Sequence, residues 1–195
     1  LHYTPHMVHT PLERSATMPT QFANGSRCGC DDRCTLQSMV NVLDSMVGNL
    51  TQALESKAMM DNLFLVFASD NGGGALDGSN FPLRGGKGNF FEGGVRGVAF
   101  IWSKLLPAEV AGNPVTEVVH ICDWWRTFCG LAAGTDAAVE CRDNKAGIHP
   151  PDSLDLWPLL SGRNQTSPHE GKPLVLGFQS DDRYSPGNAT GTGAL

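Results

Sequence analysis

The stretch Leu65-Val-Phe-Ala-Ser-Asp-Asn-Gly-Gly-Gly74 decides the fold class and contains the first candidate site. Residues 62–69 (NLFLVFAS) form a short apolar run, and the turn-forming sequence Asp-Asn-Gly-Gly-Gly at 70–74 ends that run. Such a run is typical of a strand that is covered on both faces of a parallel sheet. The sequence therefore predicts a buried strand over residues 62–69, with Asp70 and Asn71 directly after its carboxyl end.

Asp70 and Asn71 have two interpretations. Ligands of open α/β sheets bind at the carboxyl ends of strands, and carboxylate and amide oxygens are ligands that Ca²⁺ and Mg²⁺ accept. The alternative is an Asx turn, which the spacing by itself favours, because Asp and Asn before glycine are standard turn residues. An EF-hand loop is excluded, because the sixth and twelfth positions counted from Asp70 are Ala75 and Phe81 instead of Gly and Glu.

Helix and strand patterns surround this strand. Apolar residues recur every three or four positions between Thr35 and Lys57, which predicts an amphipathic helix. A second apolar run over residues 97–102 predicts another strand, and Asp123 is placed to cap a short helix that continues through Leu131. Strands mixed with helices in this way indicate an α/β fold.

A glycine-rich loop over residues 81–96 joins the two predicted strands. It has neither the Walker A spacing nor that of a dinucleotide-binding motif. Lys87 stands alone among glycines, where its charge can reach an anion or can remain solvated. Arg84, Glu92 and Arg96 have two interpretations, contacts to an anion or an Arg to Glu ion pair that holds the loop together, and the second is preferred.

Composition excludes several classes of protein. The 195 residues carry a formal net charge of -6 and no basic block, so the electrostatic footprint of a nucleic-acid-binding protein is missing. No run approaches the roughly 18 apolar residues that a membrane-spanning helix needs. Six cysteines do not fix a disulfide connectivity, and the cluster at 28–34 lacks a second Cys/His pair for zinc, which favours a local disulfide.

Sequons for N-glycosylation are more frequent than the roughly one or two expected by chance. They indicate a protein of the secretory pathway, lysosomal or extracellular. The candidate residues are Asn24, Asn49, Asn164 and Asn188.

The order and spacing of several motifs resemble the sulfatases, and most of all those of the arylsulfatase B type. The resemblance covers most of the chain and rests on six stretches: VHTPLE at 8–13, the predicted helix with its sequon GNLT at 48–51, FASDNGG at 67–73, FPLRGGKGNFFEGGVRG at 81–97, VHICDWWRTF at 119–128 and DSLDLWPLLSG at 152–162. It implies an alkaline-phosphatase-like α/β fold with a mixed, mostly parallel sheet flanked by helices. Residues 1–163 would form the C-terminal part of the catalytic domain, and 164–195 the start of a small C-terminal subdomain or a loose tail.

The resemblance also implies a site. Asp70 and Asn71 match two of the family's calcium ligands, with Mg²⁺ less favoured, and this reverses the preference for a simple turn. Lys87 and His9 match groups that hold the sulfate and stabilise its charge. A divalent cation and fixed positive charges suit sulfate ester cleavage, in which negative charge builds on the oxygens. Without the resemblance, His9 would be a lone histidine at the boundary between a strand and a loop.

One family feature has no counterpart in this chain. The sulfatase nucleophile is a formylglycine made from Cys or Ser in a C/S-x-P-S-R motif, and the residues that follow Cys28 and Cys122 do not match that motif. The paired aspartates that complete the calcium shell are also missing. The chain is therefore expected to be a fragment of a longer sulfatase, with weak metal binding, no turnover of its own, marginal stability and an unpaired sheet edge.

The predicted function is hydrolysis of aryl or saccharide sulfate esters by the parent protein. Two alternatives stay open. One is hydrolysis of phosphoesters or phosphonates on the same fold, and the other is a non-catalytic, secreted pseudosulfatase that keeps the fold as a binding surface. A fold by itself does not fix the substrate.

Overall fold

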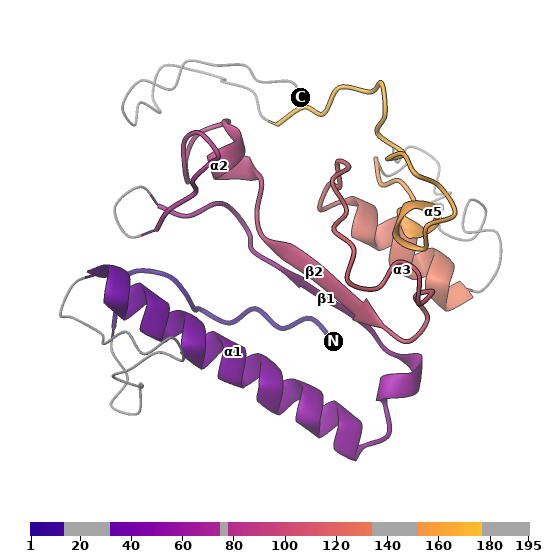
Figure 1. Ribbon diagram of the computed structural model, residues 1–195, viewed down its shortest axis with the longest axis horizontal. Helices are drawn as coiled ribbons and strands as arrows, with labels where there is room; N and C mark the ends of the chain where they lie inside the picture. The colour runs from indigo at the N-terminus through magenta and orange to yellow at the C-terminus, as the bar shows by residue number, and fades with distance from the viewer. Residues whose placement is uncertain (14–31, 75–77, 134–151, 177–195) are drawn as a thin grey trace, which may run out of the picture. The chain divides into compact units, whose positions relative to one another are not determined.

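The computed structural model describes residues 1–13, 32–74, 78–133 and 152–176 (Figure 1). These residues divide into two compact units. The first contains the described residues up to Ile101, and the second contains those from Trp102 onward. Each unit is described by itself.

The first unit begins its regular structure with the long helix α1, Asp32–Ser56. The helix predicted between Thr35 and Lys57 is therefore confirmed. Its apolar stripe is unevenly covered, because Met39 is 4% exposed whereas Val40 is 48% exposed. The helix ends in a left-handed residue, Ala58 at φ 54°, and the Met59 N–H closes the terminus by donating to the Leu54 carbonyl at 3.0 Å.

A one-turn 3₁₀ helix, η1 (Met60–Asn62), leads into strand β1, Phe64–Ala68. The chain then turns through the glycine-rich loop and the short helix α2, Glu92–Val95, into strand β2, Ala99–Ser103. Both predicted strands are thus confirmed. They pair in the only sheet that the described residues form.

The packing of β1 differs from the prediction in two respects. Its side chains are half-buried or exposed, so they are not covered on both faces. Its described neighbour β2 runs antiparallel, since the Ser69 N–H donates to the Val98 carbonyl at 2.8 Å and the Phe67 ring stacks on Phe100 at 5.0 Å. The reason is that the loop returns the chain at the same end of the sheet, whereas a parallel neighbour requires a crossover to the opposite end.

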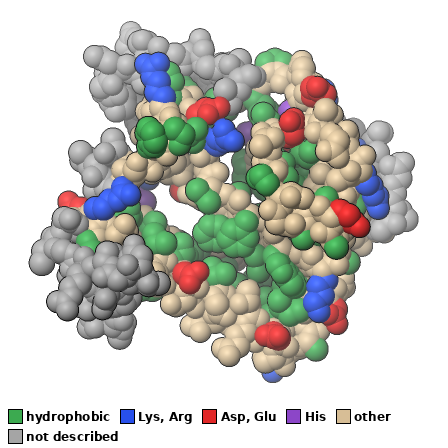
Figure 2. Space-filling view, in the orientation of Figure 1, with side chains coloured by type: hydrophobic (Ala, Val, Ile, Leu, Met, Phe, Trp, Pro, Cys, Tyr) green, Lys and Arg blue, Asp and Glu red, His purple; other side chains and the backbone are tan. Residues whose placement is uncertain are grey.

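Apolar side chains along β2 remain open to solvent. Phe100 is 47% exposed and Trp102 38%, and Val98, directly before the strand, is 73% exposed. Hydrophobic side chains accordingly reach the molecular surface in Figure 2. A two-stranded sheet with so much uncovered apolar surface contributes little stability alone. This agrees with the expected marginal stability of the chain, which stays a prediction.

In the second unit, helix α3 (Asp123–Ala133) confirms the short helix that the sequence predicts. The expectation that Asp123 caps it is wrong. The Arg126 N–H in the first turn of α3 donates instead to Ser153 Oγ at 2.9 Å, from a residue 27 positions away. The amino end of the helix is therefore capped by Ser153, a residue distant in sequence, and the carboxylate of Asp123 accepts other hydrogen bonds.

The Asp123 carboxylate is fully buried and holds the second unit together. Its Oδ2 lies 2.7 Å from His169 Nε2 and accepts from the His120 N–H at 2.9 Å. Its Oδ1 accepts from the Leu154 N–H at 2.9 Å. Next to this network lies the apolar core formed by Leu156 with the short helix α5, Trp157–Leu160. One ionisable side chain thus joins α3 to the segment that follows residue 151.

The described cysteines fall into two chemical states. Cys34 and Cys129 each take part in a disulfide, whereas Cys122 is a half-buried free thiol. Burial raises the pKa of Cys122 above its ordinary value of 9.0, and the charge and hydrogen bond of Asp123 raise it further. Cys122 is therefore a protonated thiol at neutral pH. Most of the cluster at 28–34 lies outside the described residues.

No helix in the described part of the chain combines the length and apolarity needed to cross a membrane. The division predicted after residue 163 stays a prediction.

Candidate active site

The turn after β1 presents two oxygen ligands. The Asp70 side chain is exposed and Asn71 is half-buried. The Asn71 amide donates to the Gly72 carbonyl at 2.9 Å, while Ser69 Oγ donates to the Asn71 carbonyl at 2.7 Å. Among the described residues, the Asp70 carboxylate and Asn71 Oδ1 accept no hydrogen bond. The side-chain oxygens of both residues are thus available to a hard cation.

The same two residues do not make a complete metal site. No group of three His, Cys, Asp or Glu side chains is close enough to hold a metal within the part of the chain that the structure describes. Ca²⁺ takes six to eight oxygen ligands. The donor chemistry of Asp70 and Asn71 fits calcium, but further ligands are needed.

The turn packs against α2 by backbone alone. The buried Gly72 donates its N–H to the Gly94 carbonyl at 2.9 Å. A side chain at Gly72 would overlap the Gly93 carbonyl oxygen, and one at Gly93 would overlap the carbonyls of Arg84 and Gly85. These glycines are therefore required for close approach between the turn and the loop.

Lys87 is connected to this turn through its backbone. The Lys87 N–H donates to the Gly73 carbonyl at 3.0 Å, two residues beyond Asn71. Gly85 and Gly88 on either side have φ values of 80° and 91°, which suit glycine and let the loop bend around Lys87. The site residues predicted at the strand end and in the loop thus belong to one hydrogen-bonded region of the first unit.

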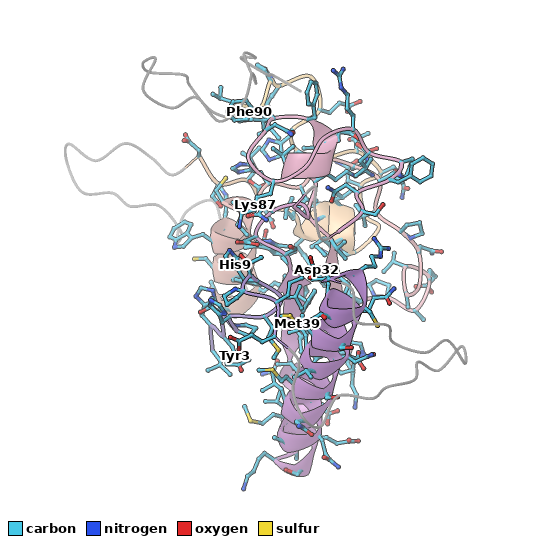
Figure 3. All side chains as sticks on the ribbon, turned by 90° about the vertical axis from the view of Figure 1, so that its left-hand side faces the viewer. Tyr3, His9, Asp32, Met39, Lys87 and Phe90 are labelled. Atoms are coloured by element: carbon cyan, nitrogen blue, oxygen red, sulfur yellow. The ribbon has the colours of Figure 1, made fainter. Side chains whose placement is uncertain are left out.

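The structure also brings Lys87 and His9 together, although 78 positions separate them (Figure 3). Lys87 Nζ lies 3.1 Å from His9 Nε2, and both residues are exposed. His9 Nδ1 lies 2.7 Å from the Thr10 carbonyl oxygen, which can only accept, so Nδ1 carries a proton. Since an ammonium group only donates, Nε2 accepts from Lys87. In this contact Lys87 is therefore the donor and His9 the acceptor.

A second histidine lies beside this pair. The ring of His6 is 5.5 Å from that of His9, with the two planes inclined at 57°. A second imidazole ring therefore lies next to the pair of Lys87 and His9.

The other charged residues of the loop have a structural role. Arg96 pairs with Glu92 at 3.5 Å, which confirms the predicted Arg to Glu ion pair. Both side chains are about half exposed, and such a surface pair contributes roughly 0–1 kcal/mol. Arg84 stacks instead over the ring of Phe91, 4.0 Å from its centroid.

The side chain of Asn80, which no sequence motif marks, bonds three backbone groups of this region. Asn80 follows Ser79 and precedes a proline-containing turn, where asparagine is unremarkable. No spacing rule would have singled it out.

The sequence that forms this site matches a known family. The family model described as Sulfatase matches residues 1–135. The chain belongs to the sulfatase family. The resemblance seen in the sequence is thereby confirmed, together with the α/β fold that it implies.

Individual relatives agree with this assignment. The chain is 34% identical to mouse "Arylsulfatase J" over 157 residues, which is 79% of this chain and 24% of that protein. It is 30% identical to human "N-acetylgalactosamine-6-sulfatase" over 163 residues, 78% of this chain and 28% of that protein. The chain thus spans about a quarter of the length of these sulfatases.

A solved structure shares both sequence and fold. The crystal structure of Ps i-CgsB in complex with k-i-k-neocarrahexaose is 32% identical and superposes with a TM-score of 0.69. The match covers 86% of this chain and 34% of that one.

Proposed function

We propose that the protein to which this chain belongs is a sulfuric ester hydrolase that acts on aryl or saccharide sulfates. The observation that carries the proposal is the pair of Lys87 and His9, 3.1 Å apart, tied by the Lys87 backbone to the turn that bears Asp70 and Asn71. This arrangement occurs in a chain of the sulfatase family. It supplies groups for a sulfate and for a cation in one region.

Lys87 and His9 would bind the sulfate and offset its growing charge. The exposed Lys87 ammonium has three donors, of which His9 uses one, so the others remain for sulfate oxygens. His9 can donate to the sulfate or to the leaving oxygen only after Nε2 takes up a proton, because Nε2 accepts from Lys87 beforehand. His9 would then act as a donor in its doubly protonated form.

Asp70 and Asn71 would hold a calcium ion, with magnesium as the less favoured ion. A bound cation supplies Lewis-acid stabilisation to the sulfate oxygens. The free oxygens of these two residues support this assignment. The remaining ligands and the formylglycine nucleophile would come from parts of the protein outside this sequence.

The proposed substrates include both saccharide sulfates and simple aryl sulfates. The match to a structure in complex with k-i-k-neocarrahexaose favours a saccharide sulfate as a substrate to test beside simple aryl sulfates. The exposed sequons at Asn49 and Asn164 support a route through the secretory pathway to lysosomes or the cell exterior. Asn24 and Asn188 lie outside the described residues.

The test uses the full-length protein with paired 4-nitrophenyl sulfate and phosphate esters and a sulfated oligosaccharide. We expect sulfate release, and we expect Lys87→Ala and His9→Ala to lower kcat/KM about 100-fold or more. Lys57→Ala is the matched control, since Lys57 is exposed at the end of α1. Faster release of phosphate than of sulfate would instead support the phosphoesterase alternative. Release of neither ester from an intact secreted protein would support the pseudosulfatase alternative.

A further inference from the structure

Asn80 bonds the backbone of two segments of the candidate site at once. Its Oδ1 accepts from the Gly73 N–H at 2.8 Å, and its Nδ2 donates to the Gly73 carbonyl at 2.9 Å. Nδ2 also donates to the Gly85 carbonyl at 3.2 Å. One side-chain amide therefore joins the turn after β1 to the loop that carries Lys87.

The bonds to Gly73 reproduce the paired N–H and C=O contacts that a neighbouring strand would make. The Gly73 carbonyl also accepts from the Lys87 N–H at 3.0 Å, so both of its lone pairs are used. Gly73 lies two residues after Asn71, and Gly85 lies two residues before Lys87. Asn80 thus bonds residues that lie within two positions of Asn71 and of Lys87, which the proposed function requires.

The two segments need such a link because they are made largely of glycine. Residues 72–74 and 85–86 carry no side chains that could fix their conformation by packing. Glycine loses more conformational freedom on ordering than any other residue, so these segments are costly to hold in place. A side chain that saturates three backbone groups restricts both segments together.

Resting on the proposed function, we propose that Asn80 is a positioning residue for sulfate ester hydrolysis. It fixes the metal-binding turn at Asp70 and Asn71 relative to Lys87, and it does not contact the substrate. Only an amide of this length supplies one acceptor and two donors here. An aspartate at the same position would keep the acceptor for the Gly73 N–H and would set a carboxylate oxygen against two carbonyls.

The experiment compares Asn80→Ala, Asn80→Asp and the control Ser79→Ala in the full-length protein. Ser79 is adjacent and exposed, and within the described part of the chain its hydroxyl accepts only from the Phe81 N–H of the same loop, at 3.4 Å. We expect both Asn80 variants to lower kcat for a sulfate ester about 10- to 100-fold, because a small misplacement of binding groups has a large kinetic effect. The Ca²⁺ concentration that gives half-maximal activity should rise, and the control should match the wild type in both values.

Amide hydrogen exchange supplies a readout that does not depend on activity. The Gly73 and Lys87 N–H groups should exchange faster in the Asn80→Ala variant and at the wild-type rate in the Ser79→Ala variant. Asn80→Asp is nearly isosteric and keeps the Gly73 N–H bond, so it provides the kinetic test if Asn80→Ala does not fold.

Two outcomes would overturn the proposal. In one, exchange at Gly73 and Lys87 is unchanged by Asn80→Ala. In the other, exchange rises while kcat and the calcium dependence stay at wild-type values, which would make Asn80 a purely structural residue. A wild-type protein with no activity on sulfate esters would count against the proposed function instead, and hydrogen exchange would still decide whether Asn80 links the two segments.

Discussion

Replacing Asp123 by asparagine should destabilise the protein far more than this small change in shape suggests. The carboxylate is fully buried, and its two oxygens face donors on both sides. On one side lie the His120 N–H and His169 Nε2, and on the other lies the Leu154 N–H. An asparagine has only one oxygen, so either orientation of its amide directs an NH₂ group at a backbone N–H.

The cost can be worked out from these contacts. One hydrogen bond is lost and one buried backbone donor has no acceptor, which costs about 1–3 kcal/mol. The remaining bonds weaken as well, because hydrogen bonds to a charged acceptor contribute about 1.5–3 kcal/mol and those between neutral groups about 0.5–1.5 kcal/mol. Together these losses give an expected decrease of about 3–5 kcal/mol in the free energy of unfolding.

Urea denaturation of the full-length protein measures this difference. Asp152→Asn is the matched control, since it removes the same charge from an exposed residue nearby. The control should stay within about 0.5 kcal/mol of the wild type. If Asp123→Asn is no more destabilising than Asp152→Asn, the carboxylate does not hold the second unit together and the reasoning fails.

The remaining predictions each concern the replacement or reactivity of a single residue. Ala58→Gly should raise the free energy of unfolding by about 0.5–1 kcal/mol in urea denaturation, because φ 54° strains an alanine and suits a glycine; a decrease would contradict this. Cys122 should react with iodoacetamide much more slowly in the native than in the denatured protein at neutral pH, since its raised pKa keeps the thiol protonated, and mass spectrometry measures the difference. Because that pKa is raised on folding, the stability it contributes is present below pH 9.0 and is lost as the pH rises through the folded value; Cys122→Ser should remove this dependence. In protein from a secreting eukaryotic host, Asn164→Gln and Asn49→Gln should each remove one unit of the mass shift seen on deglycosylation, and an unaltered shift would show that the site is not used.

Local patterns in the sequence predict the elements well, and they fail where distant residues decide the contact. The period of α1 and the apolar run of β1 both depend on neighbours within a few positions, and both are confirmed. The capping of α3 shows the limit. Asp before an apolar helical pattern predicts a cap, but the structure assigns capping to Ser153. Asp123 bonds the His120 N–H just before the helix and two groups distant in sequence, on Leu154 and His169. No local rule contains that information.

The candidate site shows the same division. Asp70 and Asn71 can be proposed from the strand that delivers them, because the end of an apolar strand is a local feature. The contact between Lys87 and His9 could not be derived from spacing, since 78 positions separate the two residues and each is unremarkable by itself. It was the family resemblance that grouped them, and the structure supplies the physical link.

The glycines around the site have a meaning that the sequence alone obscures. A glycine-rich stretch predicts a flexible loop, yet Gly72 and Gly93 are buried where a side chain would collide with backbone carbonyls. Their function is to let the turn and the loop approach within hydrogen-bonding distance, as the Gly72 to Gly94 bond of 2.9 Å shows. Close backbone packing leaves few side chains to define the geometry. This is why a single asparagine that bonds three backbone groups can matter for the chemistry of residues that it does not touch.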